Sequence, residues 1–439
     1  MTTTRRDALR RLAAAALLAT PSLPTLASDR ERSTAGIVPV PSTSSGGRVV
    51  VIGGGMAGAA CAKYLRLWGG TGVQVTMVDR EAAYNSNIMS NLVLTGQRSM
   101  ASLRYSWSTL EQRYGVVRVQ GSVVGIDPVG RSVAVATAKG MRSLAYDRLV
   151  LAPGIGFDVI PGLESAQAQA RVLHAWQAGS QTTALREQIV AMPVGGTFVM
   201  TIPPKPYRCP PGPYERACVV ADWLRVNRPG SKVLVLDANP GIVAEAHTFM
   251  TAFLGVHGGT LEYVPGVSLA SIDAASGILQ TSVGAVRGDV VNAIPRQRAA
   301  AIVTDSGLGL ARDGRWADVD LTSYASLVVP GIHVIGDAHA STQPKAGHIG
   351  NQEAKICADA IVRAFGGLAP DPSPVTNSAC YSPVTMNTAG WLTAVFAYDP
   401  QLRAMVTVGG AATEAASASS DNFEKMGKWF ATLMAETFQ

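Results

Sequence analysis

The stretch VVVIGGGMAGAACAKYL, residues 49–65, decides the fold. It reads as a buried strand, a glycine turn and the start of a helix, which together open a dinucleotide-binding unit. Gly53 permits the tight turn, Gly55 lets the backbone approach a pyrophosphate, and Gly58 lets helix and strand pack closely. A second apolar strand ends in Asp79, about 20 residues after the last glycine, where an acid suits a ribose hydroxyl. This order of elements predicts nucleotide binding.

Two later segments favour FAD over NAD. GIHVIGDAHA, residues 331–340, reads as a buried strand ending in Gly336 and Asp337, which offers a carboxylate to a flavin ribityl chain. YDRLVLAPGIG, residues 146–156, is typical of the crossing segment of FAD domains. On these segments the chain resembles the two-dinucleotide-domain flavoproteins of the glutathione reductase type. The resemblance implies an α/β fold with two doubly wound domains.

A second nucleotide-type domain repeats the strand, helix, strand and acid order, from residues 195–202 to residues 231–237. Its loop, however, reads PPKPYRCPPGP. Pro203, Pro204 and Pro206 have no amide hydrogen and a fixed φ, so this loop cannot form the array of N–H donors that cradles a pyrophosphate. We infer that the domain keeps its shape and does not bind NAD(P)H.

The N-terminal segment TRRDALRRLAAAALLATPSLPTLA, residues 4–27, reads as a twin-arginine signal peptide cut after Ala27. A disordered basic tail is the alternative. The formal charge of +6 includes four arginines and one aspartate of this leader, so the mature chain carries about +3 and gives no case for nucleic acid. No other apolar run is long enough for a membrane helix. We expect a periplasmic protein that is exported folded.

Five cysteines face this oxidising compartment, and an odd number leaves at least one unpaired. Cys61, Cys218 and Cys357 lie in helical patterns and are interpreted as buried small apolar residues. Cys209 and Cys380 lie among Pro, Tyr and Ser, as expected of loops. A purely structural disulfide between these two is one interpretation.

A specific family accounts for the whole pattern. The motifs that carry the resemblance are TRRDALRR, VVVIGGGMAGAACAKYL, YDRLVLAPGI, LHAWQAG, YRCPPGPYERA, VLVLD, GIHVIGDA, QPKAGH, NSACYS and WFATLMAETF. In this order they resemble the flavoprotein subunit of flavocytochrome c sulfide dehydrogenase over nearly the whole chain, and YRCPPGPYERA is the most specific motif. The resemblance implies that Cys209 and Cys380 form a redox-active disulfide above the flavin, with Glu215 as the acid/base beside it. A helix-start glutamate stabilised by the macrodipole is the alternative for Glu215.

The chemistry suits these residues. A sulfide anion can attack a disulfide sulfur, giving a persulfide on one cysteine and a thiolate on the other, and FAD can store the two electrons. The chain has no CxxCH heme motif, so the acceptor should be a separate protein, and the resemblance implies a c-type cytochrome subunit in a heterodimer. Two alternatives stay open: a related flavoprotein acting on another sulfur compound, and a non-catalytic partner of a cytochrome. Retention of Cys209 and Cys380 argues against the non-catalytic role, because a partner without catalytic activity has no need of a disulfide beside the flavin.

One departure concerns the flavin linkage. In the family a cysteine tethers FAD, and here Asn87 stands in its place, which predicts non-covalent FAD. Lys345 is a candidate for placing positive charge near the reduced flavin, against the alternative of a solvated loop lysine. His339 and His348 flank the same loop, but no third ligand has metal spacing, so no metal site is predicted. The candidate flavin-contacting residues are Gly53, Gly55, Met56, Ala57, Gly58, Asp79, Arg80, Asn87, Val123, Ala152, Pro153, Gly154, Gly336, Asp337, Lys345 and Gly347.

The predicted organisation has five parts. They are a signal peptide over residues 1–27, a flexible lead-in over 28–46, a discontinuous FAD-binding domain over 47–162 and 291–367, a second nucleotide-type domain over 163–290, and a small C-terminal α+β domain over 368–439. The last is expected to carry Cys380 and to support assembly.

Overall fold

The computed structural model describes residues 46–439, which fall within one compact unit. The predicted signal peptide, and the lead-in up to residue 45, lie outside the described residues. Within the described part, no helix combines the length and the apolar character needed to cross a bilayer.

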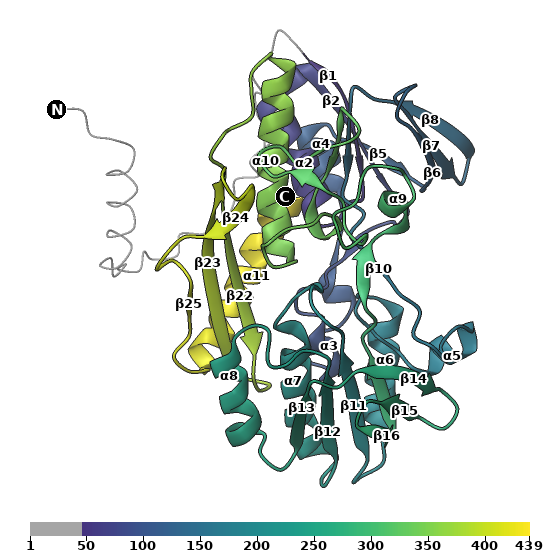
Figure 1. The fold of residues 1–439 in the computed structure, drawn as a ribbon, viewed down its shortest axis with the longest axis vertical. Coiled ribbons are helices and arrows are strands. Elements are labelled where there is room, and N and C mark those ends of the chain that lie inside the picture. The colour runs from purple at the N-terminus through teal and green to yellow at the C-terminus, as the bar shows by residue number, and fades with distance from the viewer. Residues whose placement is uncertain (1–45) are drawn as a thin grey trace, which may run out of the picture. The chain divides into compact units, whose positions relative to one another are not determined.

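The first sheet has seven strands and lies in the upper half of Figure 1. Its order is β19 (Val319–Asp320), β20 (Ala325–Ser326), β21 (Ile332–Val334), β9 (Arg148–Leu151), β1 (Gly47–Ile52), β2 (Val73–Asp79) and β5 (Val117–Gln120). The strands from β21 to β5 are parallel, and only the β19 edge is antiparallel. Residues 49–52 of β1 are all buried, as expected of a parallel strand covered on both faces.

Helices α2 (Met56–Gly69) and α10 (Gly347–Phe365) pack side by side against this sheet (Figure 1). Cys61 on α2 and Cys357 on α10 are fully buried, and so is Cys218 in the second domain. This agrees with their interpretation as small core residues. The other elements of this half are η1 (Gly70–Gly72), β3 (Tyr84–Asn85), α3 (Asn91–Leu94), η2 (Ala101–Leu103), β4 (Arg104–Tyr105), α4 (Ser108–Tyr114), β6 (Ser122–Asp127), β7 (Ser132–Thr137), β8 (Gly140–Ala145), α9 (Ala301–Thr304) and η4 (Gly336–Ala338).

The second sheet is parallel throughout. Its order is β13 (Leu261–Pro265), β12 (Lys232–Asp237), β11 (Thr197–Ile202) and β17 (Val290–Ala293), and the elements around it are α5 (Ala166–Arg171), α6 (Ser180–Ala191), α7 (Gly212–Asn227), α8 (Ala246–Thr251), a π-helical turn (Ala252–Val256), β14 (Leu269–Asp273), β15 (Ile278–Thr281) and β16 (Gly284–Arg287). The fold-class prediction of two dinucleotide-type domains is confirmed.

One predicted boundary needs correction. The return to the FAD domain was placed at residue 291, inside β17, but β17 is hydrogen-bonded in parallel to β11 of the second sheet. The chain therefore leaves that sheet only after Ala293. Its return strand β18 (Gln297–Ala299) pairs antiparallel with the outgoing strand β10 (Ile155–Phe157), so the two segments that link the domains are hydrogen-bonded to each other.

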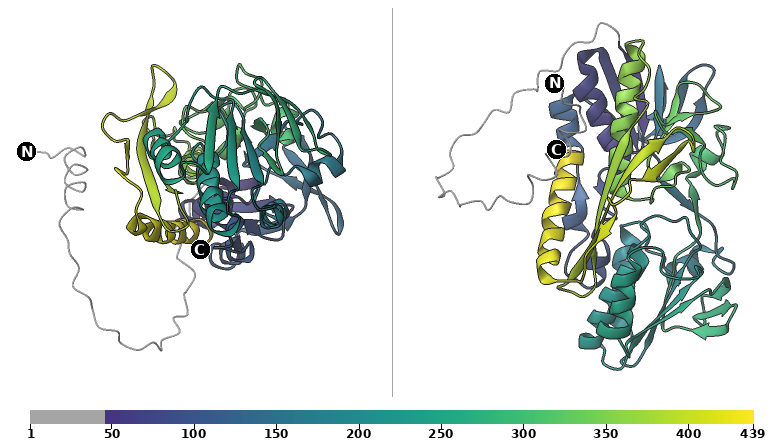
Figure 2. Two further views of the ribbon diagram at one scale, coloured as in Figure 1. Left: turned by 90° about the horizontal axis from the view of Figure 1, so that it is seen from below. Right: turned by 60° about the vertical axis from the view of Figure 1, so that its left-hand side comes forward.

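The C-terminal segment forms an antiparallel sheet and one long helix. They are β22 (Val375–Pro383), β23 (Ala389–Asp399), β24 (Ala404–Thr407), β25 (Thr413–Glu414) and α11 (Ser420–Phe438). Figure 2 shows α11, in yellow, lying along these strands. Phe396, Met405 and Phe430 join the same hydrophobic cluster as Val50 of the first sheet. The segment therefore shares the core of the FAD-type domain and has no separate core.

Candidate functional site

The glycine loop has the geometry of a dinucleotide turn. Gly53 has φ +98°, and a Cβ on Gly58 would lie 1.8 Å from the Gly53 carbonyl oxygen, so only glycine fits at Gly58. A Cβ on Gly55 would meet only Tyr84, at 3.9 Å, so the backbone there is open to a ligand. Beyond the loop, Met56 and Ala57 begin α2.

The acid at the end of β2 lies beside this loop. The Gly54 amide donates to Asp79 Oδ2 at 2.7 Å, and the Gly121 amide donates to the Asp79 carbonyl at 3.0 Å. Val123 follows Gly121 by two residues and lies in β6, which belongs to a separate three-stranded sheet with β7 and β8. Arg80 is exposed and ion-pairs with its neighbour Glu81 at 3.4 Å.

The crossing segment after β9 reaches the same edge of the first sheet. A Cβ on Gly53 would lie 2.3 Å from the Ala152 carbonyl oxygen and 3.4 Å from the Pro153 Cα atom, so this segment packs directly on the turn. Gly154 has φ +73°, and its carbonyl accepts from the Ala300 amide at 3.1 Å.

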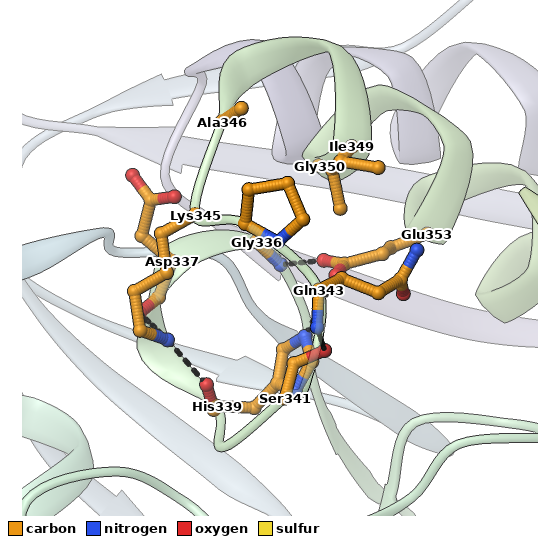
Figure 3. Close-up of a pocket in the computed structure, with 11 residues that line it drawn as sticks. Gly336, Asp337, His339, Ser341, Gln343, Lys345, Ala346, Ile349, Gly350 and Glu353 are labelled. Atoms are coloured by element: carbon orange, nitrogen blue, oxygen red, sulfur yellow. Dashed lines mark hydrogen bonds and ion pairs between the residues drawn. The ribbon is translucent and has the colours of Figure 1, made fainter. Parts of the chain in front are cut away.

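The Gly-Asp turn lines a pocket with the first turns of α10 (Figure 3). The Gly336 amide donates to Glu353 Oε2 at 2.7 Å, and Glu353 Oε1 lies 3.0 Å from His339 Nε2. Asp337 is partly exposed, and no group in residues 46–439 donates a hydrogen bond to its carboxylate. Desolvation raises the pKa of Asp337, while Arg208 and Lys345 oppose this rise. Such an unpartnered acceptor suits the hydroxyls of a ribityl chain.

Lys345 is only 7% exposed, so its interpretation as a solvated loop lysine is wrong. Its Nζ atom donates to the carbonyls of Asp337 at 3.0 Å and His339 at 2.6 Å, and lies 3.8 Å from the ring centre of Trp316. Burial lowers the pKa of Lys345 to about 8, although Asp337 and Glu353 favour its charged form. A cation is thereby held under the Gly-Asp turn.

The N-termini of α2 and α10 lie together. A Cβ on Gly347 would be 3.1 Å from Met56 Cγ, and one on Gly350 would be 3.9 Å from the Ala57 amide nitrogen. Two helix N-termini side by side favour negative charge on a ligand. Together with the open Gly55 and the unpartnered Asp337, these residues fit a flavin dinucleotide.

The cysteine loop touches the Gly-Asp loop directly. The Cys209 amide donates to the Lys345 carbonyl at 2.7 Å, although the two residues come from different domains of the chain. Cys209 has φ +57°, and its carbonyl accepts from the Gly212 amide at 2.9 Å. A Cβ on Gly212 would lie 2.9 Å from Cys209 Sγ, so glycine makes room for the sulfur.

The prediction that Cys380 lies in a loop is wrong, because Cys380 lies inside β22, where it pairs with Leu392 of β23, and β22 packs against α7. Both Cys209 and Cys380 are partly exposed, and both are free thiols in this structure, so the disulfide stays a prediction. Desolvation raises the pKa of Cys209 well above its usual value, and the charges of Glu215 and Cys380 add to this rise. Cys380 therefore lies within electrostatic reach of Cys209.

Glu215 lies in the first turn of α7 and is only partly exposed. Its Oε1 accepts from Asn91 Nδ2 at 2.8 Å. Desolvation raises the pKa of Glu215 to about 8, and the charge of Glu245 adds to this, against the Asn91 hydrogen bond and Arg216. Glu215 is therefore not a solvated helix-start residue, and near neutral pH it can both hold and release a proton.

Asn87, at the position of the family's tethering cysteine, is engaged within the protein. Its Oδ1 accepts from the Ala178 amide at 2.8 Å and lies 3.5 Å from Arg208 Nη2. Arg208 also donates to the Trp176 carbonyl. Asn87 thus helps to connect the cysteine loop to the 176–178 segment.

Several polar residues around these groups were not predicted as site residues. They are Asn91, Arg208, Arg216, Glu245 and Glu353. Arg208 and Arg216 flank Cys209 and Glu215 within YRCPPGPYERA, and their position in that motif was a usable signal. Glu353 is buried, and in the sequence it stands among the apolar positions of a helix, which is a second usable signal. Asn91 and Glu245 carry no comparable signal.

Comparison with known proteins bears on this arrangement. Residues 182–295 match the family model described as sulfide dehydrogenase [flavocytochrome c] flavoprotein chain, central, and residues 47–198 match pyridine nucleotide-disulphide oxidoreductase. The fold is similar to that of sulfide:quinone oxidoreductase from Aquifex aeolicus, with 16% identity, a TM-score of 0.73, and coverage of 89% of this chain and 91% of that chain. It is also similar to a NAD-dependent persulfide reductase from A. fulgidus, with 15% identity, a TM-score of 0.58, and coverage of 89% and 77%.

These matches confirm the resemblance predicted from the sequence. Part of the second domain is similar to a sulfide dehydrogenase flavoprotein chain, the first domain is similar to pyridine nucleotide-disulphide oxidoreductases, and the solved structures share the fold.

Proposed function

We propose that this flavoprotein oxidoreductase is a sulfide dehydrogenase that works through a redox-active disulfide between Cys209 and Cys380. The observation that carries the proposal is the hydrogen bond from the Cys209 amide to the Lys345 carbonyl, at 2.7 Å. It joins the cysteine loop of the second domain to the Gly-Asp loop that fits the flavin. Cys380 and Glu215, from two further elements, act electrostatically on the same sulfur.

In the proposed reaction a sulfide anion attacks one sulfur of the disulfide. The Cys209–Cys380 bond breaks, a new S–S bond forms in a persulfide, and the other cysteine leaves as a thiolate. Glu215 takes the proton when hydrogen sulfide rather than its anion enters. Bound FAD supplies a two-electron acceptor that can be reoxidised one electron at a time. Lys345 and the N-termini of α2 and α10 stabilise negative charge at the flavin site.

The electron acceptor in this proposal is a c-type cytochrome subunit. The central family match is to the flavoprotein chain of a flavocytochrome c, which supports such a partner. Pro203, Pro204 and Pro206 leave the second nucleotide-type loop without the amide donors that NAD(P)H needs. We also propose that the protein acts in the periplasm after twin-arginine export, because residues 4–27 resemble a twin-arginine signal peptide.

An anaerobic titration tests the function. Sodium sulfide is expected to bleach the oxidised flavin band of the purified protein, and oxidised c-type cytochrome is expected to restore it. NADH and NADPH serve as matched reductants and should leave the flavin oxidised on the turnover timescale. A flavin that stays oxidised with sulfide would contradict the proposed substrate, and rapid reduction by NADH would show that the second domain binds the nucleotide after all.

A second prediction concerns the flavin linkage. FAD should be held non-covalently, because Asn87 offers no thiol and no cysteine occurs between Cys61 and Cys209. After acid precipitation and centrifugation, nearly all flavin fluorescence is therefore expected in the supernatant. Flavin that remains attached to the denatured polypeptide, detected as a mass increase of a tryptic peptide, would count against this.

A further inference from the structure

Glu245 is a buried acid that the proposed reaction does not use. It directly precedes α8, is 4% exposed and has a left-handed backbone with φ +53°. No cation of residues 46–439 ion-pairs with its carboxylate, and the Ser382 hydroxyl is the one side-chain group there that favours its charged form. A buried carboxyl group with no cation beside it is unfavourable for folding, so a role in the site is the more economical explanation.

One side of Glu245 faces the first turn of α7. The Val243 amide, two residues before Glu245, donates to the Tyr214 hydroxyl at 3.1 Å. Tyr214 directly precedes Glu215 in the chain, and its hydroxyl also donates to Asp237 Oδ2 at 2.8 Å. This anchor fixes the segment before α8 beside the helix turn that carries Glu215.

The other side of Glu245 faces the strand that carries Cys380. Ser382 follows Cys380 by two residues on β22, so both side chains project from the same face of the strand. Ser382 is fully buried and acts on the Glu245 carboxyl group. The strand partner of Ser382 is Gly390, where a Cβ would lie 3.1 Å from Thr248 of α8. Glu245 therefore lies between α7 and the Cys380 face of β22.

The charges of this group are strongly coupled. The titratable groups that face Glu245 are Glu215 from α7, Cys380 from β22 and Glu414 from β25. Burial raises the pKa of Glu245 to about 7, with Glu414 adding to the rise and Ser382 opposing it. Burial and then the Glu245 charge raise the pKa of Cys380 to about 12. Negative charges on Glu245 and Cys380 therefore disfavour one another, which favours proton transfer from the Glu245 carboxyl group to a thiolate formed on Cys380.

We propose that Glu245 is the acid that protonates the Cys380 sulfur when the disulfide opens. This inference rests on the proposed function in one respect, namely that Cys209 and Cys380 are the reacting sulfurs. In the step, the Glu245 carboxyl proton moves to the Cys380 thiolate, giving a neutral thiol and a carboxylate, and no electrons are exchanged. Cys209, whose amide donates to the Lys345 carbonyl, is thereby left as the sulfur on the flavin side.

The test measures how fast dithiothreitol opens the disulfide of the oxidised holoprotein, with Cys380 thiol formation followed by alkylation and mass spectrometry. The rates of wild type and Glu245→Gln are compared as a ratio at each pH. The thiolate fraction of dithiothreitol is the same for both proteins at that pH, so it does not affect the ratio. We expect wild type to be at least about tenfold faster at pH 6. The advantage should disappear above the pKa of Glu245, where the carboxyl group has lost its proton.

Glu262→Gln, at an exposed position on β13, is the matched control and should behave as wild type. Glu245→Asp keeps an acid and should recover part of the rate at pH 6. A ratio of one at every pH would overturn the inference, and so would a deficit that is the same at pH 6 and pH 9. If Cys209 and Cys380 are not protected from alkylation in the oxidised protein, the proposed function fails instead. Because dithiothreitol opens any disulfide, the inference stands even if sulfide is not the substrate.

Discussion

Cys209→Ser and Cys380→Ser are each expected to slow sulfide-dependent flavin reduction by at least about a thousandfold while FAD remains bound. A serine hydroxyl fills nearly the same space but cannot form the S–S bond that sulfide attacks. The residues that fit the flavin lie on other segments, around Gly53 and Asp337. Stopped-flow absorbance of the flavin after anaerobic mixing with sulfide measures the effect, with bound FAD quantified in each variant.

Cys357→Ala is the control for these variants. Cys357 is fully buried between α2 and α10, outside the cysteine pair, and its loss should leave the reduction rate per bound flavin within about twofold of wild type. A Cys380→Ser protein that still reduces its flavin at the wild-type rate would remove the disulfide from the mechanism. Full loss in Cys209→Ser alone would then indicate a single reacting thiol.

The local parts of the fold were predictable because their signals lie in short stretches. The first glycine loop needs φ +98° at Gly53 and a missing Cβ at Gly58, and both demands are visible as glycines in the sequence. The apolar runs of β11 and β12 were placed to within two residues of the observed strands. The domain boundary at residue 291 was wrong because β17 belongs to the second sheet through its pairing with β11, about 90 residues away in the chain, which no local pattern reveals.

Site residues were predictable where they belong to a specific sequence motif. They were not predictable where only tertiary contacts bring them to the site. Cys209 and Glu215 stand in a specific motif, whereas Glu245 lies in a loop with no signal of burial. The family resemblance implied a small C-terminal domain over residues 368–439, but β23 and α11 share the hydrophobic core of the first domain. The sequence of α11 indicates an amphipathic helix, but the pattern does not say which surface its apolar face covers.

Arg216 shows the same limit most clearly. In the sequence Arg216 is one basic residue at the start of a helix. In the structure its side chain is 1% exposed and hydrogen-bonded to three segments of the chain. Its guanidinium donates to Asn91 Oδ1 and Asn292 Oδ1, both at 2.9 Å. It also donates to the carbonyls of His174 and Ala175, both at 2.8 Å, and stacks on Trp176 at 4.7 Å. Burial lowers its pKa to about 9, against the neighbouring charge of Glu215.

This network predicts a large loss of stability in Arg216→Met. The change leaves Asn91 Oδ1, Asn292 Oδ1 and the Ala175 carbonyl without this donor, whereas the His174 carbonyl keeps its hydrogen bond from Asn292 Nδ2. Removing one member of such a buried charged network costs about 3–5 kcal/mol of unfolding free energy. The Arg216 charge and the Asn91 hydrogen bond both oppose the raised pKa of Glu215, so this pKa should rise further in the variant and the corresponding limb of the activity–pH profile should move to higher pH. Lysine cannot replace the guanidinium, because one ammonium group cannot direct donors to four acceptors.

Urea unfolding, followed by tryptophan fluorescence, measures this loss. Arg225→Met on the same helix is the matched control. The Arg225 side chain is 58% exposed and, among residues 46–439, ion-pairs with Asp222 alone, so the effect should stay below about 1 kcal/mol. Equal unfolding midpoints for the two variants would mean that the acceptors around Arg216 find other donors. Among the hydrogen-bond partners of Arg216, Asn91 is the one that comes from the FAD-type domain. An Arg216→Met protein that loses stability but retains bound FAD would therefore indicate that the network holds the second domain to α3 and does not support flavin binding.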